Sequence, residues 1–245
     1  MMLNSKYLYL TIDFLTILFP VLFSFYSKAN FSKKWRNLWV AILIPGTIFI
    51  LWDEWFTQKG VWGFNEKYLS GVYLGSLPIE EILFFICIPY ASLFIYVASN
   101  YLVKKDYLGS SQKAISSTIV LVCLVIGFLN TDRWYTSTAL LGLAAYLFTL
   151  QFIWKVNFLG RFYFSYFLTL IPFFIVNGIL TGTWIEEPVV WYNNAENLGI
   201  RIGTIPAEDA LYGMFLIAMS VSILEWLQCN ITKSLGTSAI QHLKT

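Results

Sequence analysis

The residues best placed to do chemistry are two pairs of adjacent acids. Each pair follows a proline and stands at the start of a long apolar run. Glu80 and Glu81 form the first pair. Glu208 and Asp209 form the second, 128 positions later. Charge at membrane depth is costly, so a pair of acids used twice indicates function. Close carboxyl groups cannot all ionise cheaply, and one that is held protonated in an apolar pocket can act as a general acid.

Only one acid of each pair can face a site fully, because adjacent residues on a helix point about 100° apart. We predict that Glu80 and Glu208 face the pocket, and that Glu81 and Asp209 tune them or relay the proton. A structural alternative stays open. Acids in the first turn after a proline also make a favourable helix start, where unpaired N–H groups and the helix dipole attract carboxylates.

Further polar groups fall at the same predicted level, at the ends of other apolar runs. Asp53 and Glu54 end one run, and Asn177 has the matching place in a later one. We predict these three as additional site residues. Nearby aromatic side chains are predicted to contact the substrate, although anchoring at the membrane interface explains any one of them as well; they are Trp52, Trp55, Phe56, Trp62 and Trp184.

Several other chemistries lack the residues they need. The only histidine is His242, and the three cysteines are too far apart in the sequence for a metal-ligand pattern. No glycine-rich nucleotide fingerprint, P-loop or nucleophile elbow occurs. The net charge of +2 is too small to indicate a nucleic-acid partner. We therefore expect neither a metal nor a cofactor.

The composition predicts an all-α polytopic membrane protein. Of 245 residues, 58% are hydrophobic and 12% are charged, and the mean hydropathy is +0.65. Seven apolar runs are long enough, or nearly so, to cross a bilayer, with the fourth the shortest. We place the spans near 7–27, 36–56, 79–103, 115–130, 135–154, 162–180 and 206–228.

Basic residues are concentrated on one side of these spans. Eleven of the 16 fall there: Lys28, Lys33, Lys34, Arg36, Lys104, Lys105, Lys113, Lys155, Arg161, Lys233 and Lys244. Because basic loops stay in the cytoplasm, this bias predicts a multi-pass protein of the cell inner membrane, with the N-terminus outside and the C-terminus cytoplasmic. Both acid pairs then lie at the outer ends of their spans.

The chain contains an internal duplication. Gly75 aligns with Gly203, and the segment 52–57 aligns with 176–181. A single membrane domain is predicted, with repeat one at 1–108, a linking helix at 109–133, repeat two at 134–230 and a polar tail at 231–245. An odd linking span makes the two three-helix repeats parallel, related by an axis along the membrane normal. Asn177 replaces Asp53 in repeat two, which favours one asymmetric site over two equivalent ones.

The paired Pro-x-Glu-Glu and Pro-x-Glu-Asp motifs, Trp-Asp-x-x-Phe at 52–56 and Asn-Gly-x-Leu-Thr at 177–181 resemble the integral-membrane lycopene cyclases in their fused, two-repeat form. The resemblance implies a redox-neutral cyclisation of the ψ-ends of lycopene to β-ionone rings, giving β-carotene by way of γ-carotene without a cofactor. It implies lycopene from the bilayer as substrate, with membrane lipid and other carotenoid-pathway enzymes as partners.

The mechanism that the resemblance implies agrees with the acids. One acid protonates a terminal double bond, the carbocation closes a ring, and a base removes a ring proton, while aromatic faces stabilise the cation. Alternatives stay open: an ε-ring or fifty-carbon carotenoid cyclase, a non-catalytic carotenoid-binding protein, or a proton-coupled transporter. A transporter would be expected to carry its acids nearer the midplane, on broken helices.

Overall fold

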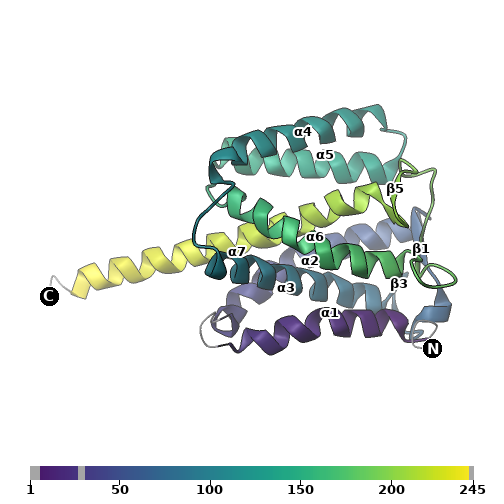
Figure 1. The fold of residues 1–245 in the computed structure, drawn as a ribbon, viewed down its shortest axis with the longest axis horizontal. Helices are drawn as coiled ribbons and strands as arrows, with labels where there is room; N and C mark the ends of the chain where they lie inside the picture. Colours follow the sequence, from purple (N-terminus) through teal and green to yellow (C-terminus); the bar gives the residue numbers. More distant parts are fainter. Residues whose placement is uncertain (1–5, 27–30, 243–245) are drawn as a thin grey trace.

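Seven α-helices lie side by side in the computed structural model, which describes residues 6–26 and 31–242, with side chains as far as Cys229 (Figure 1). Six helices are long and apolar enough to cross a membrane, and α1, with 17 residues, is shorter. The predicted all-α polytopic fold is therefore confirmed. The helices are α1 (Leu8–Ser24), α2 (Trp35–Gln58), α3 (Ile79–Leu102), α4 (Gln112–Leu129), α5 (Trp134–Phe148), α6 (Leu159–Leu180) and α7 (Ala207–His242).

Helix boundaries follow the predicted spans closely, with three differences. Pro78 precedes the first turn of α3 as its N-cap residue rather than beginning the helix. The predicted fifth span ends in a π-helical turn, Thr149–Ile153. Helix α7 continues beyond its predicted span without a break to His242, so it projects from the bundle (Figure 1).

Six short strands connect the helices at the end of the bundle where the described chain begins (Figure 1). They form three two-stranded antiparallel sheets: β1–β4, β2–β3 and β5–β6. The strands are β1 (Trp62–Phe64), β2 (Tyr73–Leu74), β3 (Leu77–Pro78), β4 (Val190–Tyr192), β5 (Arg201–Ile202) and β6 (Ile205–Pro206), and short 3-10 turns occur at Ser32–Lys34, Glu66–Tyr68 and Gly109–Ser111.

Equivalent residues in the two halves make equivalent contacts. Hairpin β2–β3 pairs Tyr73 with Pro78, and hairpin β5–β6 pairs Arg201 with Pro206, each 128 positions later. Both hairpins turn at a glycine with positive φ, 67° at Gly75 and 66° at its counterpart, a conformation that other residues adopt only with strain. Each hairpin feeds directly into the helix that carries an acid pair.

The strands β1 and β4 mark the pseudo-two-fold axis that relates the halves. They are equivalent strands, and they pair antiparallel in a register that places Gly63 opposite Trp191. These two residues are themselves 128 positions apart. An antiparallel pair centred on equivalent residues is the arrangement that a two-fold axis between them generates, so the axis passes between Gly63 and Trp191.

Adding a methyl group at Gly63 is expected to destabilise this strand pair. A Cβ there would overlap the Trp191 indole, and such overpacking costs about 1–3 kcal/mol. Gly63→Ala should therefore lower the unfolding midpoint of the detergent-solubilised protein. Gly178→Ala is the matched control, because a Cβ at Gly178 meets only Thr183 at 3.5 Å. Equal midpoints for the two variants would contradict close packing at the axis.

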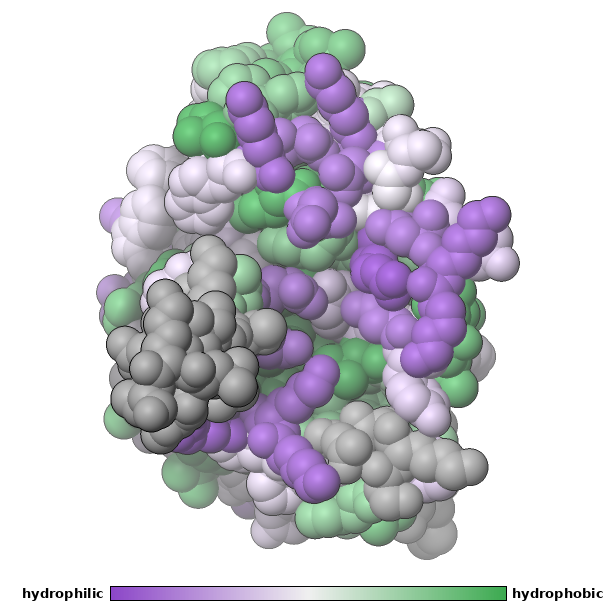
Figure 2. Space-filling model, turned by 90° about the vertical axis from the view of Figure 1, so that its left-hand side faces the viewer, coloured by the Kyte–Doolittle hydropathy of each residue, from purple (hydrophilic) through white to green (hydrophobic). Residues whose placement is uncertain are grey.

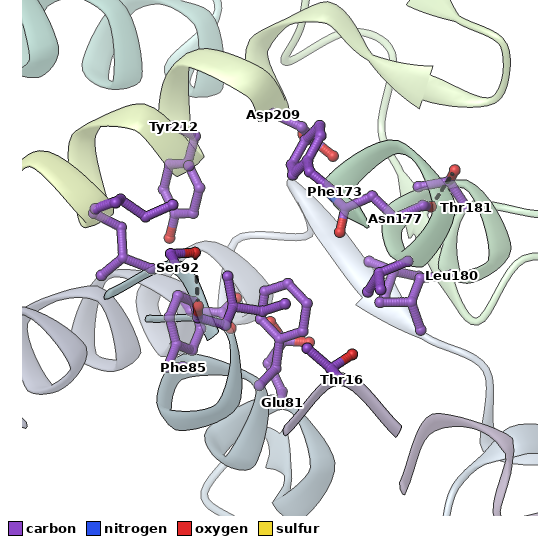
Figure 3. A pocket seen from close by; sticks show the side chains of 18 of the residues that line it. Thr16, Glu81, Phe85, Ser92, Phe173, Asn177, Leu180, Thr181, Asp209 and Tyr212 are labelled. Atoms are coloured by element: carbon purple, nitrogen blue, oxygen red, sulfur yellow. Dashed lines mark hydrogen bonds between the residues drawn. The ribbon is translucent and has the colours of Figure 1, made fainter. Parts of the chain in front are cut away.

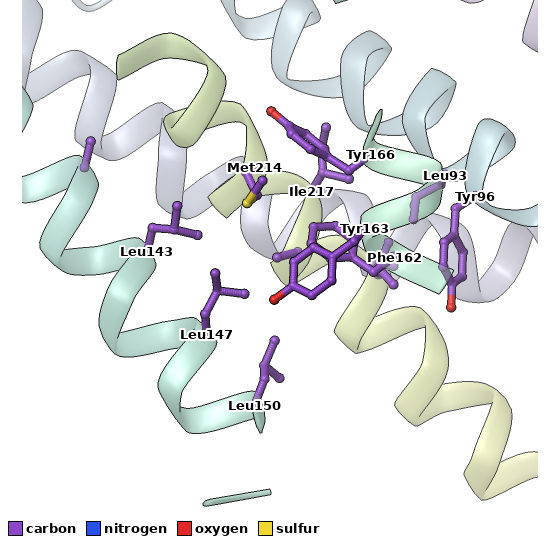
Figure 4. Close-up of a cluster of buried hydrophobic side chains, with 14 of the residues drawn as sticks. Leu93, Tyr96, Leu143, Leu147, Leu150, Phe162, Tyr163, Tyr166, Met214 and Ile217 are labelled. Carbon is purple, nitrogen blue, oxygen red and sulfur yellow. The ribbon is translucent and has the colours of Figure 1, made fainter. Parts of the chain in front are cut away.

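The main hydrophobic core lies between α3, α5, α6 and α7 (Figure 4). Leu143 and Leu147 of α5 face Phe162 of α6 and Ile217 of α7, and all four are almost fully buried. Helix α4 packs along α5 at the edge of the bundle. This core joins the first turns of α6 to the middle of the apolar part of α7, and so sets the space that remains between the other end of α6 and the start of α7.

Candidate active site

A pocket lies beneath the β1–β4 pair, close to the pseudo-two-fold axis. Side chains from both halves line it: α1, α2, α3 and β1 contribute from the first, and α5, α6, α7 and β4 from the second. Figure 3 shows Glu81, Asp209, Tyr212 and Asn177 around this space. Apolar and aromatic side chains form most of the wall, and three acids are among the lining residues: Asp53, Glu81 and Asp209.

Glu81 and Asp53 form a buried carboxyl pair on the first-repeat side. Glu81 Oε2 accepts a hydrogen bond of 2.6 Å from the hydroxyl of Tyr9. Asp53 Oδ1 accepts from the indole N–H of Trp62 and, at 3.5 Å, from the Thr57 hydroxyl. Asp53 Oδ2 is buried without a donor among the described residues, and the two carboxyl groups are close enough to influence each other electrostatically. Two neighbouring carboxyl groups in a buried pocket cannot both ionise cheaply, so this pair favours holding one proton.

Asp209 has a different environment on the second-repeat side. Its Oδ1 accepts a hydrogen bond of 2.5 Å from the hydroxyl of Tyr135. Its Oδ2 accepts one of 2.9 Å from the hydroxyl of Tyr192. Burial raises the pKa of the Tyr192 phenol well above its ordinary value, and the negative charge of Asp209 adds to the effect, so this phenol remains a donor. With a donor on each oxygen, Asp209 is arranged as a carboxylate that accepts hydrogen bonds.

Glu80 and Glu208 do not face the pocket, so the prediction of their orientation is wrong. Both are almost fully buried, but each turns back to the loop before its helix. Glu80 Oε1 accepts a hydrogen bond of 2.7 Å from the backbone N–H of Ser70. Glu208 Oε1 accepts one of the same length from the backbone N–H of Leu198. Glu208 also accepts 2.6 Å from the Thr136 hydroxyl. Buried loop N–H groups need acceptors, and these two acids supply them.

Glu54 also holds a loop and lies outside the pocket. Its two carboxylate oxygens accept 3.1 and 2.9 Å from the backbone N–H of Ser76, beside the turn at Gly75. Asn177 does line the pocket. The structure therefore brings Asp53, Asn177 and one acid of each motif together and leaves the other acids in the scaffold.

The predicted aromatic contacts divide in the same way. Trp62 lines the pocket. Trp52 and Phe56 lie behind it, with Phe56 packed edge-on against Trp62 and Trp52 against Tyr212. The prediction that they line the site is wrong for both. It is also wrong for Trp55 and Trp184, which are 40% and 70% exposed and fit anchoring at the interface.

Four tyrosines and one acid complete the surroundings of the site but are absent from the residues predicted above. Tyr9, Tyr135, Tyr192 and Tyr212 all line the pocket. With 15 tyrosines in the chain, no pattern distinguishes these. Asp13, in α1 one turn below Tyr9, is 3% exposed and its Oδ2 has no donor among the described residues. An isolated acid inside an apolar run was the signal that could have identified it.

A sequence model described as lycopene cyclase matches residues 6–99 and 132–227. These two segments hold both motifs and every acid of the pocket. The chain belongs to the lycopene cyclase family. The matched segments leave out the whole of α4, which contributes no residue to the pocket.

Curated relatives of this lycopene cyclase family member are fungal. A bifunctional lycopene cyclase/phytoene synthase of Aspergillus niger is 24% identical over an alignment of 241 residues, which covers 90% of this chain and 38% of that protein. The enzyme of the same name from Neurospora crassa is 24% identical over an alignment of 170 residues, which covers 58% of this chain and 27% of that protein. The chain thus spans less than two fifths of the length of these relatives. No solved structure matches it.

Removing a donor from Asp209 is expected to slow the reaction without abolishing it. Tyr135→Phe keeps the ring and deletes the hydroxyl that donates at 2.5 Å. A hydrogen bond to a charged group is worth about 1.5–3 kcal/mol, or roughly a tenfold to hundredfold change in rate. Tyr163→Phe is the control, because its hydroxyl bonds Ser116 in the core, away from the pocket. The rate at which each purified variant converts substrate in lipid vesicles is the measurement. Equal rates for the Tyr135 and Tyr163 variants would contradict the role of Tyr135.

Proposed function

We propose that this protein is a lycopene β-cyclase, an isomerase that closes β-ionone rings at the ψ-ends of lycopene and gives β-carotene by way of γ-carotene. The proposal rests on one observation: three buried acids line the same apolar and aromatic pocket. Glu81 and Asp53 lie on one side of it and Asp209 on the other. A hydrocarbon substrate offers no polar group to such a pocket. Only its double bonds can react, and protonation is the reaction that a buried acid supplies.

The first step uses the Glu81–Asp53 pair as the acid. Its shared proton is transferred to the terminal double bond, which leaves a tertiary carbocation. The neighbouring double bond attacks this cation, and a six-membered ring closes with the positive charge on a ring carbon. Trp62 and Tyr212 line the pocket, and a cation–π contact to such a ring is worth about 0.5–2 kcal/mol.

The second step uses Asp209 as the base. It removes a proton from the ring carbon next to the cation, and the electron pair forms the double bond of the β-end. The proton gained and the proton lost balance, so the product is an isomer of the substrate. The proton then returns from Asp209 to the Glu81–Asp53 pair across the pocket before the next ring closes.

We further propose that the protein lies in the cell inner membrane with the strand-bearing end outside and the opposite end in the cytoplasm. Hydrophilic side chains gather on that opposite end (Figure 2). The connectors and helix ends there carry many of the basic residues, including Lys33, Lys104 and Arg161. Cytoplasmic loops of membrane proteins show the same excess of positive charge.

Expression in lycopene-accumulating bacteria tests the proposed function. β-Carotene in the pigment extract is the expected result, with γ-carotene as the intermediate. Unchanged lycopene, together with good membrane expression, would reject the cyclase. ε-Ring products or cyclisation only of fifty-carbon carotenoids would keep the acid chemistry but replace the proposed substrate or ring type. Tag accessibility from the two sides of the membrane tests the orientation.

A further inference from the structure

The pocket does not end at the acids but continues as a furrow along one face of α3. Glu81, Phe84, Ile88, Ala91 and Ile95 line it in order. Their spacing of three and four residues places them in one stripe on the helix. At a rise of 1.5 Å per residue, the stripe is about 21 Å long. The furrow therefore runs from the outer acids past the middle of the span.

Helices α1 and α6 are the walls of this furrow, and they close it only at its outer end. There Leu8 and Ile12 of α1 belong to the same buried cluster as Leu180 of α6. Deeper in the membrane, Thr16 of α1 lines one side of the furrow and Phe173 of α6 the other (Figure 3). The floor residues of α3 remain partly exposed at this depth, so the furrow opens sideways, toward lipid.

Three hydroxyls that line the deeper part of the furrow, on α1, α3 and α6, are already occupied within the chain. The hydroxyls there are used by their own helices: Thr16 bonds the carbonyl of Ile12 at 2.8 Å, Ser92 that of Ile88 at 2.8 Å, and Thr169 that of Ser165 at 3.0 Å. The remaining floor is apolar. An occupant without polar groups loses nothing on entering such a surface, which is the chemistry of a hydrocarbon chain.

The equivalent furrow in the other half is filled. Leu216 of α7, the counterpart of Ile88, also borders the pocket, but it is only 2% exposed. Phe49 and Trp52 of α2 pack on Tyr212 there, with ring centroids 4.9 and 5.2 Å apart. In the aligned segments, position 52 corresponds to Val176 of α6. A large indole thus occupies one furrow where a small valine leaves the other open.

We propose that the furrow between α1 and α6 is the lateral opening through which a polyene reaches the acids from the bilayer, and that Val176 keeps it open. The proposal rests on the proposed function for its choice of polyene. One end of the chain reaches Glu81, and the part that does not react lies along α3 and leaves between the walls. Because the second furrow is blocked, the two ends of the substrate use the same opening one after the other.

Substituting tryptophan for Val176 tests this opening, because it adds the side chain that fills the sister furrow. The measurement is the amount of lycopene retained per protein after purification, in a Glu81→Gln background that binds without turnover. We expect Val176→Trp to lower it by about tenfold or more, since overfilling a closely walled site excludes its occupant. Val122→Trp is the matched control, on the exposed face of α4 and outside the pocket.

A second variant protects the test against misfolding of the first. Ala91→Phe blocks the furrow from its floor, with Ala145→Phe on the exposed face of α5 as its control. Elution volume and unfolding midpoint establish that each variant is folded. If folded Val176→Trp and Ala91→Phe retain as much lycopene as their controls, the opening is wrong. If both furrow variants lose lycopene while their controls retain it, but the unsubstituted chain never cyclises lycopene, the proposed reaction fails while the opening stands.

Discussion

Glu81→Gln is expected to reduce cyclisation by about 10²–10⁴-fold, the usual contribution of a general acid. The amide keeps the size of the side chain and can still accept from Tyr9, which donates at 2.6 Å to Glu81. It cannot share or release the carboxyl proton on which the first step depends. Pigment conversion by equal amounts of folded protein in vesicles is the measurement, with lycopene as substrate.

Glu80→Gln is the matched control, one residue away and chemically identical. Glu80 lies outside the pocket and accepts from the backbone N–H of Ser70, a bond that an amide oxygen can also accept. We expect a stability loss of about 1–3 kcal/mol, because its buried second oxygen becomes an unpaired amide, with conversion per folded molecule largely unchanged. If Glu80→Gln lost more activity than Glu81→Gln, Glu80 would be the acid instead.

Asp209→Asn is expected to cost a similar factor of about 10²–10⁴, for the opposite reason. The substitution leaves the acid pair able to protonate the substrate but removes the base that takes the ring proton. The asparagine amide can accept from only one of the two phenols that now donate to Asp209, Tyr135 and Tyr192. Conversion of lycopene should fall, and any remaining product should contain a larger share of ring isomers from loss of a different proton.

Glu208→Gln is the corresponding control in the second repeat. Glu208 accepts from Leu198 N–H and from the Thr136 hydroxyl, and an amide oxygen can retain both bonds. Product analysis by chromatography should therefore give the normal ring type for this variant. If Glu208→Gln changes the ring type and Asp209→Asn does not, the assignment of the base is wrong.

The asymmetry of the site arises within a nearly symmetric scaffold. The two acid-pair helices, their hairpins and the β1–β4 pair obey the two-fold relation, and so do the loop contacts of Glu80 and Glu208. The differences lie in the partners of the pocket acids. Glu81 has Asp53 as a second carboxyl, whereas Asp209 has a second phenol, from Tyr192. A duplicated structure thereby separates the acid from the base.

The sequence by itself determined the membrane class, the seven helices, the duplication and the two acid motifs. These depend on apolar run length, the repeated spacing and the positions of prolines and acids, all of which are local in the chain. The helix ends agreed to within a few residues because a polar or charged residue stops an apolar run at the same place in either description. The π-helical turn at Thr149–Ile153 and the extension of α7 to His242 could not be predicted from hydropathy.

Tertiary structure alone decided which acid of each pair faces the pocket. Both acids fall in the first turn of their helix, and the spacing fixes only the angle between them, not the direction of either. That direction depends on where the segment before each helix places its N–H groups. Glu80 accepts a hydrogen bond from the N–H of Ser70, whereas Glu81 accepts one from the hydroxyl of Tyr9. The meeting of Asp53 with Glu81, from different helices, likewise exists only after packing, because no local pattern records which side chains two helices bring together.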